Sequence, residues 1–224
     1  MLFQDRTDAG RWLARALVKY KAHRPVVLAL PRGGVPVAAE VAAALDAPLD
    51  LVLVRKIGVP SQPELAMGAV TDGGSPTIIR NSEIIELCGV SERKFDAVCK
   101  EELGEIECRR KRYLGDRART EVKGEVVIVV DDGIATGATT LAAVRAIRER
   151  RPKELVLAVP VAPLDTIEKL RAEVDDIVCL ETPGDLGAIG YFYRDFHQVS
   201  DDEVISTLRR FPANRAVQVS DGSS

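Results

Sequence analysis

The sequence is poor in the side chains that build metal centres and disulfide frameworks. Its 224 residues include 2 histidines and 4 cysteines. The cysteines form no C-x-x-C pair and no Cys/His spacing typical of a zinc site, and their uneven separations do not suggest a disulfide framework. We therefore expect no metal site built by the protein alone, and reduced thiols as in a cytoplasmic protein. The cysteines are Cys88, Cys99, Cys108 and Cys179.

Long apolar runs and an excess of positive charge are also missing. No segment approaches the roughly 18 consecutive apolar residues of a membrane-spanning helix, and the N-terminus lacks the pattern of a signal peptide. With 31 basic and 34 acidic residues the net charge is −3, so no general cationic field attracts nucleic acid. The composition argues against a membrane or nucleic-acid partner. A chain of this length predicts one α/β domain with an excursion.

Residues 125–150 join a strand, two carboxylates, a loop of glycine and threonine, and a helix. Residues 126–130 are an unbroken β-branched run, typical of a parallel strand covered by helices on both faces. Asp131 and Asp132 follow directly, at the strand end where ligands bind in open α/β sheets. This stretch is the first candidate for a ligand site.

The loop after the two acids predicts a phosphate site. Gly133 and Gly137 allow the backbone to turn tightly and to approach a ligand. The helix starts near residue 140, so the loop amides lie at a helix N-terminus whose dipole favours an anion. We expect a phosphate on this loop and a polyhydroxylated group on the acids. The hydroxyl donors are Thr136, Thr139 and Thr140.

Two other phosphate-binding motifs do not match. A Walker loop needs a lysine where Ala138 stands, and a dinucleotide fingerprint needs a third glycine beside Gly133 and Gly137. A glycine turn and two acids that only cap a helix remain the structural alternative.

The stretch closely resembles the phosphoribosyl pyrophosphate binding motif of type I phosphoribosyltransferases, in which an apolar strand and two acids precede T-G-x-T at a helix start. The resemblance implies that Asp131 and Asp132 bind the ribose 2′ and 3′ hydroxyls and that the following loop binds the 5′-phosphate. It also implies that Mg²⁺ enters with the substrate. The loop residues expected at the phosphate are Ala135, Thr136, Gly137, Ala138, Thr139 and Thr140.

A second unit of strand, glycine loop and helix begins at residue 26. Gly33 and Gly34 make amides available at the helix start and Arg32 adds a permanent cation, which predicts a second anion site. In the resembled family pyrophosphate binds here, in a loop that often contains a non-proline cis peptide. The bond between Pro31 and Arg32 is the candidate. An ordinary turn that carries an arginine is the alternative.

Residues 49–54 are predicted to form a third strand that delivers Arg55 and Lys56 to the same sheet edge. With Arg32, three cations would converge there. The resemblance implies that these residues contact pyrophosphate and that residues 58–68 form a mobile lid. Two solvated charges that close a strand are the alternative.

The middle of the chain departs from the alternation of strands and helices. Residues 65–80 predict an edge hairpin around Asp72-Gly73-Gly74, and residues 81–115 predict a helical excursion. The basic run 109–112 is typical of a solvated helix end. An oligomer contact, as in a homodimer, and a phosphate clamp are the alternatives.

The two ends of the chain carry weaker signals. Residues 5–20 predict an amphipathic helix with Trp12 on its buried face. Aromatic side chains cluster in residues 182–198, where the resemblance implies a hood in which Tyr191 stacks on a base, and packing against the core is the alternative. The remaining predictions are strands at 155–159 and 176–180, capping boxes at Asp165 and Ser200, one domain over residues 1–212, and a tail at 213–224 with little reason to order.

These patterns predict an α/β protein with a mostly parallel, doubly wound sheet, a helical excursion and an edge hairpin. The resemblance implies a phosphoribosyltransferase that moves the 5-phosphoribosyl group between phosphoribosyl pyrophosphate and a nitrogenous base or other nucleophile, releasing pyrophosphate. Its catalytic residues would be Arg32, Lys56, Asp131 and Asp132. Ala135 stands where oxopurine transferases carry an acid, so the acceptor stays open. A non-catalytic sensor of phosphoribosyl pyrophosphate or nucleotides, and a hydrolase, are the alternatives.

Overall fold

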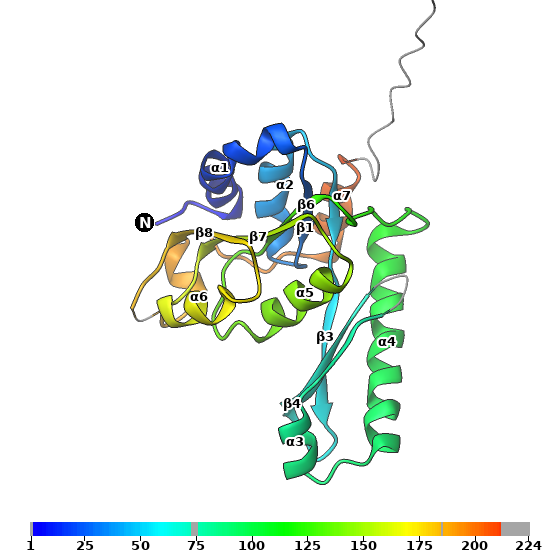
Figure 1. Cartoon of the computed structure of the whole chain (residues 1–224). Coiled ribbons are helices and arrows are strands. Elements are labelled where there is room, and N and C mark those ends of the chain that lie inside the picture. The colour runs from blue at the N-terminus through cyan, green and yellow to red at the C-terminus, as the bar shows by residue number, and fades with distance from the viewer. Residues whose placement is uncertain (1, 73–75, 185, 212–224) are drawn as a thin grey trace, which may run out of the picture.

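A five-stranded sheet forms the centre of the molecule (Figure 1). The computed structural model describes residues 2–72, 76–184 and 186–211, so the predicted tail and the glycines of the hairpin turn lie outside the described residues. The strand order is β2-β1-β6-β7-β8 and every pairing is parallel, as predicted. The strands are β1 Val26–Ala29, β2 Leu49–Leu51, β6 Val126–Val130, β7 Glu154–Val161 and β8 Asp176–Glu181.

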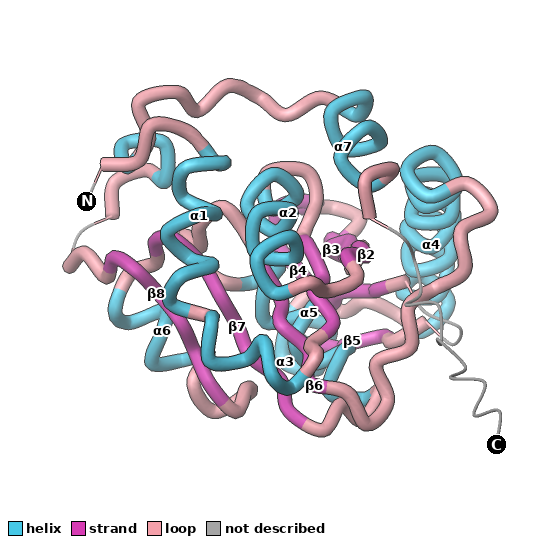
Figure 2. Tube along the Cα trace, turned by 90° about the horizontal axis from the view of Figure 1, so that it is seen from above, coloured by secondary structure: helices cyan, strands magenta, loops and turns pink. Residues whose placement is uncertain are grey.

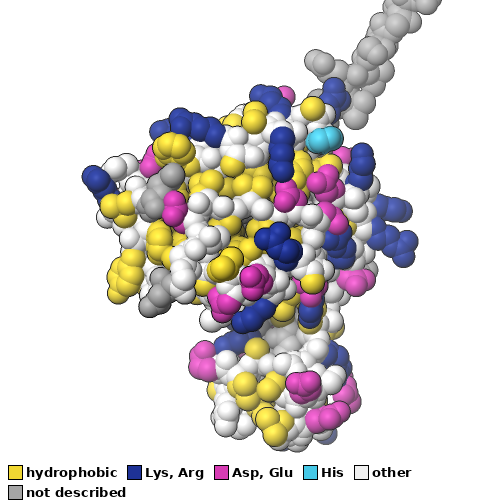
Figure 3. Space-filling model, turned by 60° about the vertical axis from the view of Figure 1, so that its left-hand side comes forward, with side chains coloured by type: hydrophobic (Ala, Val, Ile, Leu, Met, Phe, Trp, Pro, Cys, Tyr) yellow, Lys and Arg dark blue, Asp and Glu magenta, His cyan; other side chains and the backbone are white. Residues whose placement is uncertain are grey.

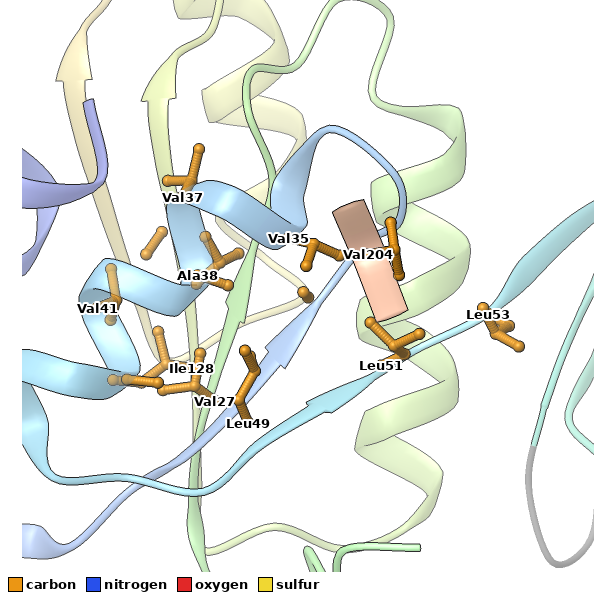
Figure 4. Packing of buried hydrophobic residues seen from close by; sticks show 14 of the residues in the cluster. Val27, Val35, Val37, Ala38, Val41, Leu49, Leu51, Leu53, Ile128 and Val204 are labelled. Atoms are coloured by element: carbon orange, nitrogen blue, oxygen red, sulfur yellow. The ribbon is translucent and has the colours of Figure 1, made fainter. Parts of the chain in front are cut away.

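Helices cover both faces of this sheet, because alternate side chains of each strand point to opposite sides. Within β6, Ile128 belongs to the core cluster of α1 and α2, and Val127 to the cluster of α5 and α6. Figure 4 shows the first cluster, with Val27 and Ile128 beneath the apolar face of α2. The helices of the body are α1 Arg6–Ala16, α2 Gly34–Leu45, α5 Ala138–Glu149, α6 Leu164–Leu170 and α7 Asp201–Leu208, with 3₁₀ turns η1 Val18–His23 and η2 Ile189–Phe192.

A second, antiparallel sheet and the helical excursion together form an arm that extends from the body (Figures 1 and 3). Phe95 fixes the helix to the sheet: it is 1% exposed, lies against Gly68, and carries the Arg80 guanidinium 4.1 Å above its ring. The predicted hairpin and excursion are therefore one structure. Its elements are β3 Val54–Val59, β4 Gln62–Thr71, β5 Ile78–Arg80, α3 Ser82–Leu87 and α4 Glu92–Leu114.

The strand predicted at residues 49–54 is wrong in its second half. β2 ends at Leu51, and β3 begins in the other sheet, where it pairs with β4. The chain changes sheets at Leu53, whose amide donates to Asp72 Oδ1 at 2.9 Å and whose carbonyl accepts from the Asp72 amide at 2.9 Å. These two hydrogen bonds direct the chain into the arm. No local sequence pattern indicates that Leu53 pairs with Asp72.

Two predictions about the site change as a result. Arg55 and Lys56 lie within β3, opposite Val70 and Ala69 of β4, and not at the carboxyl end of a strand of the central sheet. Residues 58–68, predicted as a loop, mostly belong to the paired strands β3 and β4. The segment that was expected to form a lid is thus the tip of a hairpin.

The helix predicted at residues 5–20 is shorter and rotated. α1 ends at Ala16, and Trp12 is 41% exposed instead of buried. The reason is close packing of α1 on α2: a Cβ added to Gly10 would lie 2.7 Å from Val37 O. Helices this close leave no room for an indole between them, so a small residue occupies the contact and the tryptophan faces outward.

The two predicted capping boxes have opposite outcomes. The N-cap of α6 is Pro163, and Asp165 lies in the first turn, where its carboxylate accepts from the Thr166 amide. The box at α7 is confirmed: Ser200 Oγ accepts from the Glu203 amide at 3.2 Å, and Glu203 Oε2 accepts from the Ser200 amide at 2.7 Å.

Candidate active site

The two predicted anion loops lie side by side at the carboxyl edge of the central sheet, because β1 and β6 are neighbours. Ala29 pairs with Val130, and the Leu30 amide donates to Val130 O at 2.9 Å. The peptide bond between Pro31 and Arg32 is cis, as predicted. One edge of the sheet thus presents both loops to the same space.

Gly33 and Gly34 permit this contact between the loops. A Cβ on Gly33 would overlap the Asp132 carboxylate, and one on Gly34 would lie 2.7 Å from Val130 O. The glycines are needed for close approach. The Gly34 amide, expected to be available to an anion, instead donates to Leu30 O at 3.0 Å.

Asp132 is a buried, ion-paired carboxylate. Its Oδ2 accepts from Arg6 Nε at 2.7 Å, and both side chains are nearly inaccessible to solvent. Tyr193 donates its hydroxyl proton to Asp132 O at 2.5 Å. Arg6 also donates to His197 O at 2.7 Å and lies 3.9 Å from the centroid of the Phe196 ring. Asp132 therefore ties the strand end to the N-terminal helix and to the segment after β8.

Asp131 is the more available acid of the pair. It is half-buried, and its Oδ1 accepts from the Asp132 amide at 2.9 Å. Burial and then the negative charge of Asp132 raise the pKa of Asp131 well above its usual range, with Arg6 acting in the opposite direction. The site thus holds one paired acid, Asp132, and one available acid, Asp131. A bound hydrogen-bond donor or cation would stabilise the carboxylate form of Asp131.

The predicted phosphate loop precedes an uncapped helix. Gly137, with φ of 79°, is the N-cap of α5, and no side chain of the described residues caps that end. The Ala135 carbonyl accepts from Thr166 Oγ1 at 3.0 Å, which holds the loop in place. Thr140 is 2% exposed and packs inward, so the accessible part of the loop is Ala135, Thr136, Ala138 and Thr139.

The three predicted cations do not line one cavity in this structure. Arg55 and Lys56 line a cavity of about 480 Å³ between the arm hairpin and α4. Arg55 Nε is 2.6 Å from Glu102 Oε2, and Lys56 Nζ is 3.0 Å from Glu64 Oε2. Arg32 lines a different cavity, of about 430 Å³. The separation follows from the change of sheet after β2, which moves Arg55 and Lys56 into the arm.

The aromatic segment after β8 divides into packed and exposed rings. Tyr193 is buried, with its centroid 5.4 Å from that of Phe3 and 4.9 Å from that of Phe196. Tyr193 and Phe196 thus pack against the protein, as the alternative to a hood predicted. Tyr191 is 77% exposed, so its face is open to a ligand and its predicted role stays a prediction.

Three residues of the site were missed as functional candidates or left unassigned. Arg6 and Tyr193 contact Asp132 from 126 and 61 residues away in the sequence. No local signal marked Arg6, and Tyr193 was marked only as one of the aromatic side chains clustered in residues 182–198. Arg109 lines both cationic cavities. Its signal was the basic run at 109–112, which the sequence left open between a solvated helix end, an oligomer contact and a phosphate clamp.

The fold and the paired loops define the class of the protein, and comparison with known proteins agrees. The chain matches the family model of the phosphoribosyl transferase domain over residues 4–194. It therefore belongs to the phosphoribosyl transferase domain family, as its central motif predicted.

Specific relatives extend this assignment. Two Mycobacterium tuberculosis proteins, from strains CDC 1551 and H37Rv and provisionally named phosphoribosyl transferases, are 46% identical over 209 residues, or 93% of this chain and 47% of each relative. The chain thus spans about half the length of these curated relatives. A Thermus thermophilus protein of known crystal structure is 39% identical, with a TM-score of 0.83 over 95% of this chain and 100% of that one.

No helix in the described part of the chain is long and apolar enough to cross a membrane. Within residues 2–72, 76–184 and 186–211, no group of three or more His, Cys, Asp or Glu side chains is arranged to hold a metal ion.

Proposed function

We propose that this domain transfers a 5-phosphoribosyl group between phosphoribosyl pyrophosphate and a nitrogenous base or other nucleophile, with release of pyrophosphate. The observation that carries the proposal is the shared sheet edge: the available carboxylate of Asp131 and the uncapped α5 N-terminus follow β6, and the loop of Arg32 and Gly33 follows the neighbouring strand β1. A sugar with a phosphate at one end and pyrophosphate at the other matches an arrangement in which a carboxylate lies between two anion-binding loops.

In the proposed reaction the bond between C1 and the pyrophosphate oxygen breaks, and its electron pair leaves with pyrophosphate. The acceptor then forms the new bond to C1 and loses its proton. Positive charge develops on the sugar and negative charge on the leaving group, so positioned charges are more useful than a protein nucleophile. Asp131 holds the ribose on one side, the α5 N-terminus holds the 5′-phosphate, and arginines face the leaving group, while Asp132, paired with Arg6, supports the strand end from inside.

Mg²⁺ fits this site as a companion of the substrate. Because the Asp132 carboxylate is already paired with Arg6, Asp131 is the acid left to assist the ion, and most ligands would be oxygens of the sugar and pyrophosphate. When bound, the ion would neutralise charge that builds on the pyrophosphate.

A thermal unfolding experiment tests the proposal. Phosphoribosyl pyrophosphate with Mg²⁺ at one hundred times its dissociation constant should stabilise the protein by about 2.7 kcal/mol. NAD serves as the control, because the loop lacks the dinucleotide fingerprint. A shift with NAD and none with phosphoribosyl pyrophosphate would contradict the proposal.

A sensor that binds the same ligand without reaction is the second candidate. Ala135, in place of an acid, leaves the phosphate loop without a side chain that could exchange a proton with an acceptor base. Release of pyrophosphate during incubation with a panel of bases separates the two candidates. Binding without release for any acceptor would favour the sensor.

A further inference from the structure

The C-terminal half of α4 forms one wall of a cationic cavity beside the loop of Pro31 and Arg32. The cavity has a volume of about 430 Å³. α7 lies beside α4 (Figure 2) and contributes Asp201 to the lining of the cavity. Its charged lining consists of Arg32, Arg109, Arg112, Glu105 and Asp201.

The charges of this cavity are unevenly satisfied. Arg112 Nη1 is 2.6 Å from Asp201 Oδ2, and Arg32 Nη1 is 3.8 Å from Asp201 Oδ1. Tyr113 donates its hydroxyl proton to the same Oδ1 at 2.6 Å. Arg109 has neither an ion pair nor a side-chain hydrogen bond within the part of the chain that the structure describes. One carboxylate is thus shared by two guanidinium groups, while a third has no direct partner.

We propose that Arg109 and Arg112 of α4 join Arg32 in binding the leaving pyrophosphate, and that Asp201 occupies part of this site until the anion displaces it. This inference rests on the proposed function and names the residues at one end of its substrate. A phosphate oxygen and a carboxylate oxygen accept the same hydrogen bonds from a guanidinium group, so they compete for it. Pyrophosphate carries more charge and more acceptors than one carboxylate, and it is the stronger competitor.

The position of Arg109 supports this assignment over Arg55 and Lys56. Arg109 lines the cavity of Arg32 and also the cavity of Arg55 and Lys56, so it connects the two cationic regions. Arg55 is already held by Glu102 at 2.6 Å. The helical excursion therefore brings Arg109 to the cavity that the cis peptide loop lines.

Asp201 can give up its partners without leaving an unstable helix end. It lies in the first turn of α7, where the helix dipole favours a negative charge and the Ser200 box supplies the cap independently. Displacement would free Arg112 and the Tyr113 hydroxyl, both of which are donors suited to phosphate oxygens.

The test compares Arg109→Ala with Lys111→Ala by calorimetric titration of pyrophosphate and, separately, ribose 5-phosphate. Lys111 is an exposed cation on the same helix that does not line the cavity, so its removal changes the net charge equally. Arg109→Ala should weaken pyrophosphate binding about tenfold or more, the loss typical of a charged hydrogen-bonding partner, and should spare ribose 5-phosphate. Lys111→Ala should change neither by more than about twofold.

Asp201→Asn provides a test of opposite sign. Removing the competing charge should strengthen pyrophosphate binding, by about threefold or more, because asparagine competes less well for the arginines. A purely structural role of these residues would instead weaken binding in both variants, and that result would overturn the inference. Unchanged pyrophosphate affinity in Arg109→Ala would also overturn it. Failure of the wild-type protein to bind either ligand would overturn the proposed function itself.

Discussion

At the scale of single residues, the two adjacent acids have different environments and should respond differently to substitution. Asp132 has a buried guanidinium partner in Arg6, whereas Asp131 lies beside another carboxylate and has no ion-pair partner among the residues that the structure describes. Of the two acids expected to bind the ribose hydroxyls, Asp132 is therefore already occupied by a partner inside the protein. An ion pair that is nearly inaccessible cannot be broken on one side without leaving the other charge uncompensated.

We predict that Asp131→Asn stabilises the protein and Asp132→Asn destabilises it. The raised pKa of Asp131 means that the folded state binds a proton more tightly than the unfolded state, so stability falls as pH rises from the usual aspartate value through the raised value. Asparagine removes this loss, which should add on the order of 1 kcal/mol at pH 7. Asp132→Asn leaves Arg6 without a carboxylate and should cost about 3 kcal/mol. Urea unfolding at pH 7 and pH 4 measures both changes.

For Asp131→Asn the gain should shrink at pH 4, and ribose 5-phosphate binding should weaken at every pH. Glu168→Gln, an exposed change on α6, is the control. A loss of stability in Asp131→Asn at pH 7 would contradict the sign of the pKa shift.

At the scale of elements, α7 depends on its N-terminal cap because the helix is short. The 8-residue helix carries its box at Ser200 and Glu203, and it brings Asp201 to the cationic cavity. Hydrogen bonds from the Ser200 amide and hydroxyl, followed by that with His197, lower the pKa of Glu203 to about 2. The carboxylate form is thus preferred in the folded state.

We predict that Glu203→Gln lowers stability at pH 7 and that the difference from wild type disappears on acidification. A depressed pKa adds stability above the usual value of 4.5, and this contribution is lost as pH falls towards about 2. Unfolding by urea between pH 7 and pH 2 gives the difference at each pH. A difference that stays constant across this range would show that the charge of Glu203 does not contribute.

At the scale of the whole molecule, the arm and the body share one apolar core. Phe95 and Ile106 of α4 belong to the same buried cluster as Leu13 of α1 and Val41 of α2. α4 also carries Arg110, whose Nη1 is 2.9 Å from Asp72 Oδ2 at the point where the chain enters the arm. The arm should therefore unfold together with the body.

We predict that Phe95→Ala costs about 3 to 5 kcal/mol and shifts a single unfolding transition, because truncation of a buried ring leaves a cavity. The sequence has 1 tryptophan, Trp12 in α1, which reports on the body far from the changed residue. Its fluorescence and the far-ultraviolet dichroism should move together on heating. A tryptophan transition that stays at the wild-type temperature would mean that the arm unfolds separately.

Local patterns in the sequence determined the parts of this protein that depend on near neighbours. The β-branched run at 126–130, the acids after it and the glycine turn before α5 specified a buried strand, its carboxyl end and an open helix N-terminus, because each follows from side-chain type and spacing alone. The cap at Ser200 was predicted from a short motif as well, whereas the cis bond between Pro31 and Arg32 was predicted from the resemblance to the family.

Only the tertiary structure decided which groups meet. The departure of the chain at Leu53 placed Arg55 and Lys56 in the arm, and the return of α4 placed Arg109 beside Arg32. The Arg6 and Asp132 pair likewise joins residues 126 apart. Such contacts depend on strand pairing and on helix packing between residues far apart in the sequence. The local hydrophobic pattern does not encode these contacts, because an apolar face has the same pattern whichever partner buries it.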